Sequence, residues 1–273
     1  GPTRWLSHDI FTNGIVYLDL GFDLHALPTE LLPYLSLVGR TFTEMGTEKE
    51  DYVRLSQRIG RKTGGIHPEL FASTKADGRE SVTWLFLRCK AMTGRTLELL
   101  ELLRDLLLTV RLDNPDRFRQ MVLEEKSRVE QRLVPNGHQF VNLRIKSHFN
   151  ESDWFAEQVS GISYLFFLRD LVRRLDTDWP GVLEDLQTIR TTLIDGRNMV
   201  VNVTCDGGDL HRIESSLRGF IGEMPQRPGG GPTAAAWRRD SPPLFEGLSI
   251  PSQVNYVGKG MNLLDLDLWS SLP

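Results

Sequence analysis

The chain contains 273 residues, of which 40% are hydrophobic and 25% are charged, and its formal net charge is −4. This length suits one large domain or two small ones, and the composition is ordinary for a soluble globular protein. The basic residues are scattered along the sequence, which argues against nucleic acid as a partner. Even the most apolar stretch, Leu97 to Val110, is interrupted by charged residues, so the sequence predicts no membrane-spanning helix.

The two cysteines, Cys89 and Cys205, have no metal-binding or redox spacing, and we expect both to be reduced thiols in strands. The sequence begins with Gly1-Pro2 instead of a methionine, and no signal or transit peptide is recognisable. We therefore expect the natural N-terminus to be missing, and the sequence itself indicates no compartment.

The first half of the chain predicts a sheet. Ile15 to Leu24 has apolar residues at every second position, as a strand with one buried face does. Two further strands, Ile66 to Thr74 and Ser81 to Ala91, flank an Asp77-Gly78 turn that is typical of a hairpin. The last of these strands is apolar on both sides, which predicts a central strand covered on both faces. The apolar face of the first strand consists of Val16, Leu18, Leu20, Phe22 and Leu24.

A junction between two helices is predicted between Thr43 and Ile66. Gly46 ends the first helix, because glycine readily adopts the left-handed conformation found just past a helix end. Thr47 then caps the second helix, and Glu50 completes a capping box three residues later.

The second half is predicted to be mainly helical. Leu97 to Val110 is apolar on several sides, which favours a buried helix. Asn114-Pro115 is a typical helix start, and it opens a long helix that ends at Leu133. Within this helix, Glu124 and Arg128 have the spacing of a surface ion pair.

A strand with Met199, Val201 and Val203 on one face follows, and then a last helix for which Asp209 is the expected N-cap. This order of strands, hairpin and helices predicts an α+β fold with a mostly antiparallel sheet covered by helices.

The stretch from Gln226 to Ser252 is rich in proline and glycine and has almost no periodicity, so it predicts a linker. Val254 to Val257 then predicts a short strand. We accordingly expect an α+β domain at residues 1–225, a linker at 226–252, and the first strand of an incomplete further domain at 253–273.

No catalytic constellation is apparent. The inverted zinc-peptidase motif His-x-x-Glu-His brings two histidines to one metal and a glutamate to the bound water. None of the six histidines begins or ends this motif, and the nearest approach, His211-x-x-Glu214, is followed by Ser215. A solvated helix face is the favoured interpretation of that stretch. We predict no catalytic and no metal-binding residue in this chain, and its substrate-binding residues are unknown.

A cluster of aromatic residues after Ser152 leaves two interpretations open. It could line a peptide groove, or it could pack in the core, and core packing is favoured because aromatic side chains contribute large buried areas. The cluster consists of Trp154, Phe155, Tyr164, Phe166 and Phe167.

Several short stretches together resemble a known family. Their order and spacing are similar to the middle region of the presequence protease branch of the pitrilysin/insulinase-type zinc metallopeptidases. The resemblance extends from about Leu6 to Leu264, whereas the tail to Trp269 departs from it. The stretches are Asn13-Gly-Ile-Val-Tyr17, Glu44-Met-Gly46, Asp51-Tyr52 with Lys62-Thr-Gly-Gly65, and Gln253-Val-Asn-Tyr-Val-Gly258.

The resemblance implies a protease of four related α+β domains that close around an unfolded peptide. In that family the zinc motif belongs to the first domain, so zinc is implied as a cofactor of the full-length parent, with ligands outside this chain and none in it. Residues 1–225 then resemble the third, noncatalytic domain, which forms part of the chamber wall. The implied activity of the parent is the hydrolysis of targeting presequences and other short unfolded peptides by a zinc-bound water, and this segment alone is predicted to be inactive.

The implied partners are unfolded peptide substrates and the remaining domains of the same protease. The implied compartment is the mitochondrial matrix or the chloroplast stroma, or the cytoplasm in a bacterium. The alternative is a catalytically inactive peptide-binding or scaffold module of the same fold, because a fold alone does not determine a function. An upstream His-x-x-Glu-His motif would distinguish the two.

Overall fold

The computed structural model describes residues 3–76, 80–226, 237–239 and 242–262. The strands form one five-stranded sheet with the order β1-β5-β2-β4-β3. β1 and β5 are parallel, and the other neighbouring pairs are antiparallel, which confirms the predicted α+β fold with a mostly antiparallel sheet. The strands are β1 (Arg4–Asp9), β2 (Ile15–Asp23), β3 (Ile66–Thr74), β4 (Ser81–Met92) and β5 (Met199–Cys205).

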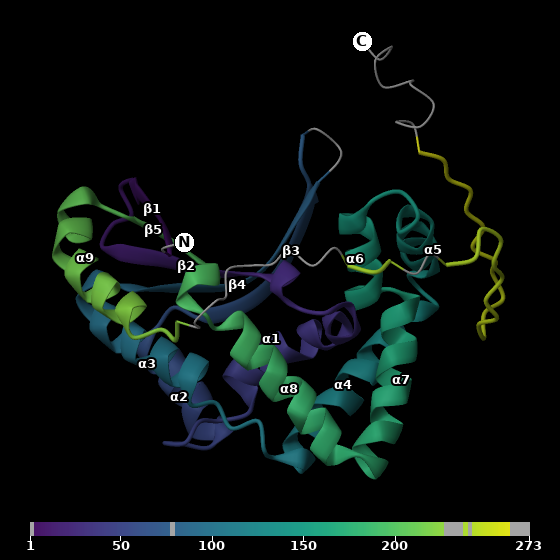
Figure 1. The fold of residues 1–273 in the computed structure, drawn as a ribbon, viewed down its shortest axis with the longest axis horizontal. Coiled ribbons are helices and arrows are strands. Elements are labelled where there is room, and N and C mark those ends of the chain that lie inside the picture. The colour runs from purple at the N-terminus through teal and green to yellow at the C-terminus, as the bar shows by residue number, and fades with distance from the viewer. Residues whose placement is uncertain (1–2, 77–79, 227–236, 240–241, 263–273) are drawn as a thin grey trace, which may run out of the picture.

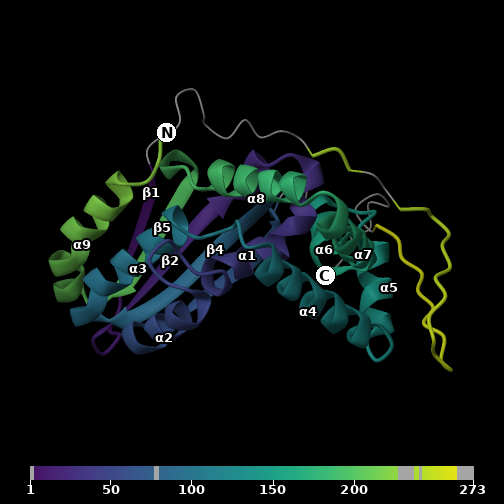
Figure 2. The same ribbon diagram turned by 90° about the horizontal axis from the view of Figure 1, so that it is seen from below.

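The helices form two groups (Figure 1). α1, α2 and α3 lie on one side of the sheet, which is also clear in the view from below (Figure 2). α4, α5, α6 and α7 form a second group beside the sheet. The helices are α1 (Leu35–Glu44), α2 (Tyr52–Lys62), α3 (Thr96–Leu108), α4 (Pro115–Leu133), α5 (Gly137–Lys146), α6 (Glu151–Ser160), α7 (Ile162–Thr177), α8 (Trp179–Leu193) and α9 (Gly207–Gly222).

The core lies between the sheet and the helices. The predicted apolar face of β2 is confirmed, since Val16, Leu18, Leu20 and Phe22 are almost completely buried. The alternating residues of β4 and β5 that point the same way, such as Leu87 and Val201, are buried too. Each large apolar side chain of this kind stabilises the fold by about 1.5–3 kcal/mol relative to an exposed position.

The prediction that β4 is covered on both faces is wrong. Only one face of this strand is buried, and on the other face Trp84 and Phe86 are half-buried while Arg88 and Lys90 are exposed. The apolar residues on the second face shield one another instead of packing against helices. The pattern of the sequence indicated apolar character on both faces, but it did not distinguish these two forms of shielding.

The helix junction is partly as predicted. Gly46 ends the region of α1 with a φ of +84°, in the left-handed conformation that glycine tolerates. The cap of α2 is Asp51 and not Thr47, because the Asp51 side chain accepts a hydrogen bond from the Arg54 N–H at 2.9 Å. Thr47 instead forms an isolated β-bridge with Val110. Aspartate is as good an N-cap as threonine, so this tertiary contact decides between the two.

Two further strand and cap assignments differ. β1 was not predicted, because its mostly exposed residues do not alternate and its partner β5 comes much later in the chain. The N-cap position of α9 is Asp206, and Asp209 lies one turn further on, where its carboxylate accepts a hydrogen bond from the Thr93 hydroxyl.

The strand predicted at Val254 to Val257 is not observed, and residues 242–262 contain neither strand nor helix. Among the described residues no strand lies beside this stretch, so its backbone lacks the partner that a strand requires. Parts of the predicted linker and tail, and the Asp77-Gly78 turn, lie outside the described residues.

Replacing Gly46 with alanine is expected to destabilise the fold by about 2 kcal/mol, because a side chain is strained at this φ. The added Cβ would also lie 2.8 Å from the Glu50 carbonyl oxygen. Gly60→Ala is the matched control, since nothing lies within 4 Å of its Cβ position, and it should stabilise α2 by about 0.5–1 kcal/mol. Urea unfolding measures both, and equal effects would contradict the assigned role of Gly46.

Candidate functional site

The described residues do not fit a zinc site. His211 is exposed on α9, and the Glu214 carboxylate accepts two hydrogen bonds from Arg218, at 2.9 and 2.6 Å. Within the described part of the chain, no three His, Cys, Asp or Glu side chains come close enough together to hold a metal ion. No chemical step through a metal is therefore derived for this chain.

The cysteines offer no nucleophile. Cys89 on β4 and Cys205 on β5 are buried free thiols in strands, as predicted. Burial raises the pKa of the Cys89 thiol above its ordinary value, so this group stays protonated at neutral pH.

The feature with the clearest potential to bind a ligand is the face of the sheet turned away from α1, α2 and α3, which we call the open face. The strand register brings side chains of neighbouring strands together there: Phe71 lies opposite Trp84, and Asp19 lies between Arg88 and Asn202. Its main side chains are Tyr17, Asp19, Glu69, Phe71, Trp84, Phe86, Arg88 and Asn202.

Three aromatic rings form the centre of the open face. The Trp84 and Phe86 ring centroids are 6.1 Å apart and the rings are stacked, while Phe71 meets Phe86 edge-on at 6.3 Å. The Phe86 ring lies over Gly21 of β2, where a Cβ would be only 2.6 Å from the ring. A glycine at this position therefore allows the ring to lie flat across the neighbouring strand.

Polar groups surround these rings. The Arg88 guanidinium lies 5.3 Å from the centre of the Phe86 ring and forms an ion pair with Glu69 at 2.6 Å. On the other side, the Asn202 amide donates to the Asp19 carboxylate at 3.2 Å and its oxygen lies 2.9 Å from His8 Nε2. Aromatic faces beside fixed charges can bind apolar and cationic side chains without selecting one sequence.

The aromatic cluster predicted after Ser152 is mostly core. Trp154, Phe155 and Tyr164 are almost completely buried, which confirms the favoured interpretation for them. Phe166 differs, because it is 49% exposed on α7.

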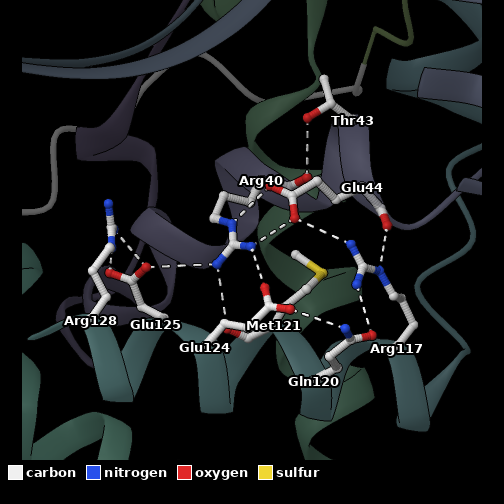
Figure 3. A network of polar contacts seen from close by, with 9 residues as sticks. All are labelled: Arg40, Thr43, Glu44, Arg117, Gln120, Met121, Glu124, Glu125 and Arg128. Carbon is white, nitrogen blue, oxygen red and sulfur yellow. Dashed lines mark hydrogen bonds and ion pairs between the residues drawn. The ribbon is translucent and has the colours of Figure 1, made fainter. Parts of the chain in front are cut away.

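An ion-pair network joins α1 to α4 (Figure 3). Arg40 binds both oxygens of Glu44, at 2.8 and 2.7 Å, and reaches Glu124 at 3.0 Å. Arg117 donates to the Glu44 carbonyl oxygen at 2.9 Å, and Arg128 holds both oxygens of the buried Glu125.

The predicted pair of Glu124 with Arg128 is wrong. Arg128 turns to Glu125, one residue further along α4, and Glu124 binds Arg40 from α1 instead. The hydrogen bond to Glu44 is the main cause that raises the pKa of Arg40, with burial opposing it. All the carboxylates in this network are paired with guanidinium groups, so the network is suited to joining helices and not to acid–base catalysis.

A family model for the region associated with peptidases of family M16, subfamily C, matches residues 1–171. The chain belongs to this peptidase-associated family. Presequence protease 1 (chloroplastic/mitochondrial) of Arabidopsis thaliana is 38% identical over 94% of the chain, which covers 24% of that protein. Protein HypA of Clostridium perfringens is 26% identical, and the mitochondrial presequence protease of Saccharomyces cerevisiae is 24% identical, over 94% and 92% of the chain and 26% of each protein.

These relatives confirm the resemblance of this peptidase-associated chain to presequence proteases, and the chain spans about a quarter of their length. A solved structure of a conserved protein from Enterococcus faecalis has a similar fold, with a TM-score of 0.58 and 13% identity, over 82% of this chain and 50% of that one. No described helix is both long and apolar enough to cross a membrane.

Replacing Arg40 with methionine is expected to destabilise the peptidase-associated chain by about 2 kcal/mol. Buried ion pairs that lose one partner typically cost about 3–5 kcal/mol, and the loss is smaller here because Glu125 keeps Arg128 and Glu44 keeps Arg117. Arg169→Ala, which breaks the exposed pair with Glu130, is the control and should cost about 0.5 kcal/mol or less. Equal shifts in urea unfolding would show that the network does not stabilise the helix contact.

Proposed function

We propose that this chain is a noncatalytic segment of a longer zinc metalloendopeptidase that degrades targeting presequences and other short unfolded peptides. The names of the relatives support this proposal, as does the share of their length that the chain covers. The zinc ligands of the parent would lie outside the described residues, in keeping with the lack of a suitable donor group among them.

The observation that carries the proposal is the open face. A wall that meets peptides of many sequences needs contacts that select no single side chain, and the rings of Phe71, Trp84 and Phe86 offer such contacts. Organellar targeting peptides are rich in arginine and poor in acidic residues. Guanidinium groups stack well on tryptophan, and Asp19 supplies a carboxylate on the same face of the sheet.

The proposed domain organisation places a third-domain-like unit at residues 1–225, a linker at 226–252 and the start of a further domain at 253–273. It is supported by the end of the last described helix at Gly222 and by the lack of regular structure in residues 242–262. The partners would be the remaining domains of the parent and its peptide substrates. Leu244, Phe245 and Val257 support a neighbouring domain, because these apolar side chains are between 83% and 95% exposed.

The proposed compartment is the mitochondrial matrix or the chloroplast stroma, as the relatives named for these organelles suggest. In a bacterium it would be the cytoplasm.

The test is a paired assay on the 273-residue chain: zinc content by elemental analysis, and cleavage of a quenched fluorescent peptide with an arginine-rich presequence-like sequence. The expected result is neither stoichiometric zinc nor cleavage. Stoichiometric zinc with cleavage that a chelator stops would contradict the noncatalytic role. His211→Ala is the control for adventitious metal, because it removes the histidine of the stretch closest to a zinc motif.

A further inference from the structure

Trp237 ties down the segment that the sequence predicted as a linker. Its side chain is only 5% exposed. The indole N–H donates to the Leu27 carbonyl oxygen at 3.0 Å, and the next residue, Arg238, donates its backbone N–H to the Thr29 hydroxyl at 3.1 Å. The segment is therefore anchored to the turn that follows β2.

Aromatic rings surround the Trp237 indole. The His25 imidazole is stacked on it, with ring centroids 4.5 Å apart and an interplanar angle of 15°. Phe155 of α6 is also stacked on it at 5.6 Å, and Trp154 lies at 6.1 Å. We call this set of contacts the Trp237 anchor.

Beyond the anchor, the described residues of the segment, 237–239 and 242–262, form a strap that is held on α5. Arg144 binds both oxygens of Glu246, at 2.8 and 2.9 Å. Further along, the Tyr256 hydroxyl donates to the Val134 carbonyl oxygen. Gly258 lies so close to α5 that a Cβ there would be 2.5 Å from the Ile145 side chain.

The surroundings of His25 favour its charged form. Nδ1 lies 3.0 Å from the Asp23 carboxylate, and Nε2 lies 3.0 Å from the Glu151 carboxylate of α6. A neutral imidazole has one N–H, so one ring nitrogen would place its lone pair against a carboxylate, whereas the imidazolium donates to both. The pKa of His25 is accordingly raised, mainly by the hydrogen bond to Asp23, with burial opposing it and Glu151 adding to it.

The other groups around this pair leave that preference in place. The hydroxyls of Thr83 and Ser81 on β4 contact His25 and Glu151, respectively. Burial opposes the ionisation of Glu151, but Ser81, His25 and Arg239 of the strap outweigh it and lower the pKa of that carboxyl. Glu151 therefore stays a carboxylate beside His25.

The charge of His25 matters for the strap because an aromatic face attracts a cation far more strongly than a neutral ring. We propose that Trp237 is a proton-dependent anchor that holds the strap firmly while His25 is charged and loosens when His25 loses its proton. The strap would then be a fastened element at low pH and a partly released one at high pH.

The sign follows from the raised pKa. The contribution of the charged His25 is fully present below its ordinary pKa of about 6.5, and it is lost as the pH rises through the raised value.

The experiment is to follow the exchange of the Trp237 indole N–H with solvent by NMR between about pH 5.5 and pH 8.5, a range that brackets the ordinary histidine pKa. Trp237→Phe assigns the resonance. Protection, relative to a free indole at the same pH, is expected to fall as the pH rises. The fall should be about tenfold for each unit by which anchoring raises the pKa of His25.

In His25→Gln, protection is expected to be low at every pH. Glu151→Gln removes one of the two carboxylates and keeps the ring contacts, so the midpoint of the pH profile should move to lower pH. The matched control is His138→Gln, because His138 lies beside Tyr256 of the same strap, at 6.3 Å between ring centroids, and should leave the profile unchanged.

Constant protection of the wild-type indole across this range would overturn the proposal. The same pH profile in wild type and His25→Gln would overturn it as well. If His25→Gln fails to fold, Glu151→Gln decides alone, and an unmoved midpoint contradicts the role of His25.

Discussion

The one-sided burial of the sheet is the constraint on which the rest of the structure depends. Because β2, β4 and β5 direct alternate side chains to the helices, one face of the sheet becomes the core and the other stays accessible. The accessible face still contains aromatic side chains, which are shielded by one another and by the close approach of Phe86 to Gly21. The same alternation that builds the core therefore also creates the surface to which we assign the contact with peptide.

Charged contacts join the second group of helices to this core. Arg40 connects α1 with α4, and Arg144 connects α5 with both Glu157 of α6 and Glu246 of the strap. In each case the guanidinium group binds carboxylates from more than one segment, which fixes their relative positions more firmly than a single exposed pair would. The strap thus belongs to the folded unit, although its sequence has the composition of a linker.

Local pattern explains what the sequence predicted well, and competition between distant groups explains what it did not. The fold class, the β3–β4 hairpin and the buried face of β2 follow from alternation and turn residues. Glu124 and Arg128 have the spacing of a pair, but Arg40 arrives from another helix and offers Glu124 a better partner. Trp237 gave no periodic signal, because its partners come from the turn after β2 and from α6. The open face could not be found from sequence, since it requires knowing which side of the sheet the helices cover.

The most direct test of the account is photo-crosslinking of an arginine-rich, presequence-like peptide to this chain. A photoreactive phenylalanine analogue would replace Phe71 on the open face in one sample and Phe166 on α7 in another, because the two side chains are comparably exposed, at 39% and 49%. The account predicts cross-links from position 71 and few from position 166, with mass spectrometry locating the site. Equal cross-linking at both positions, or cross-linking only at position 166, would contradict the assignment of the open face as the surface that meets peptide.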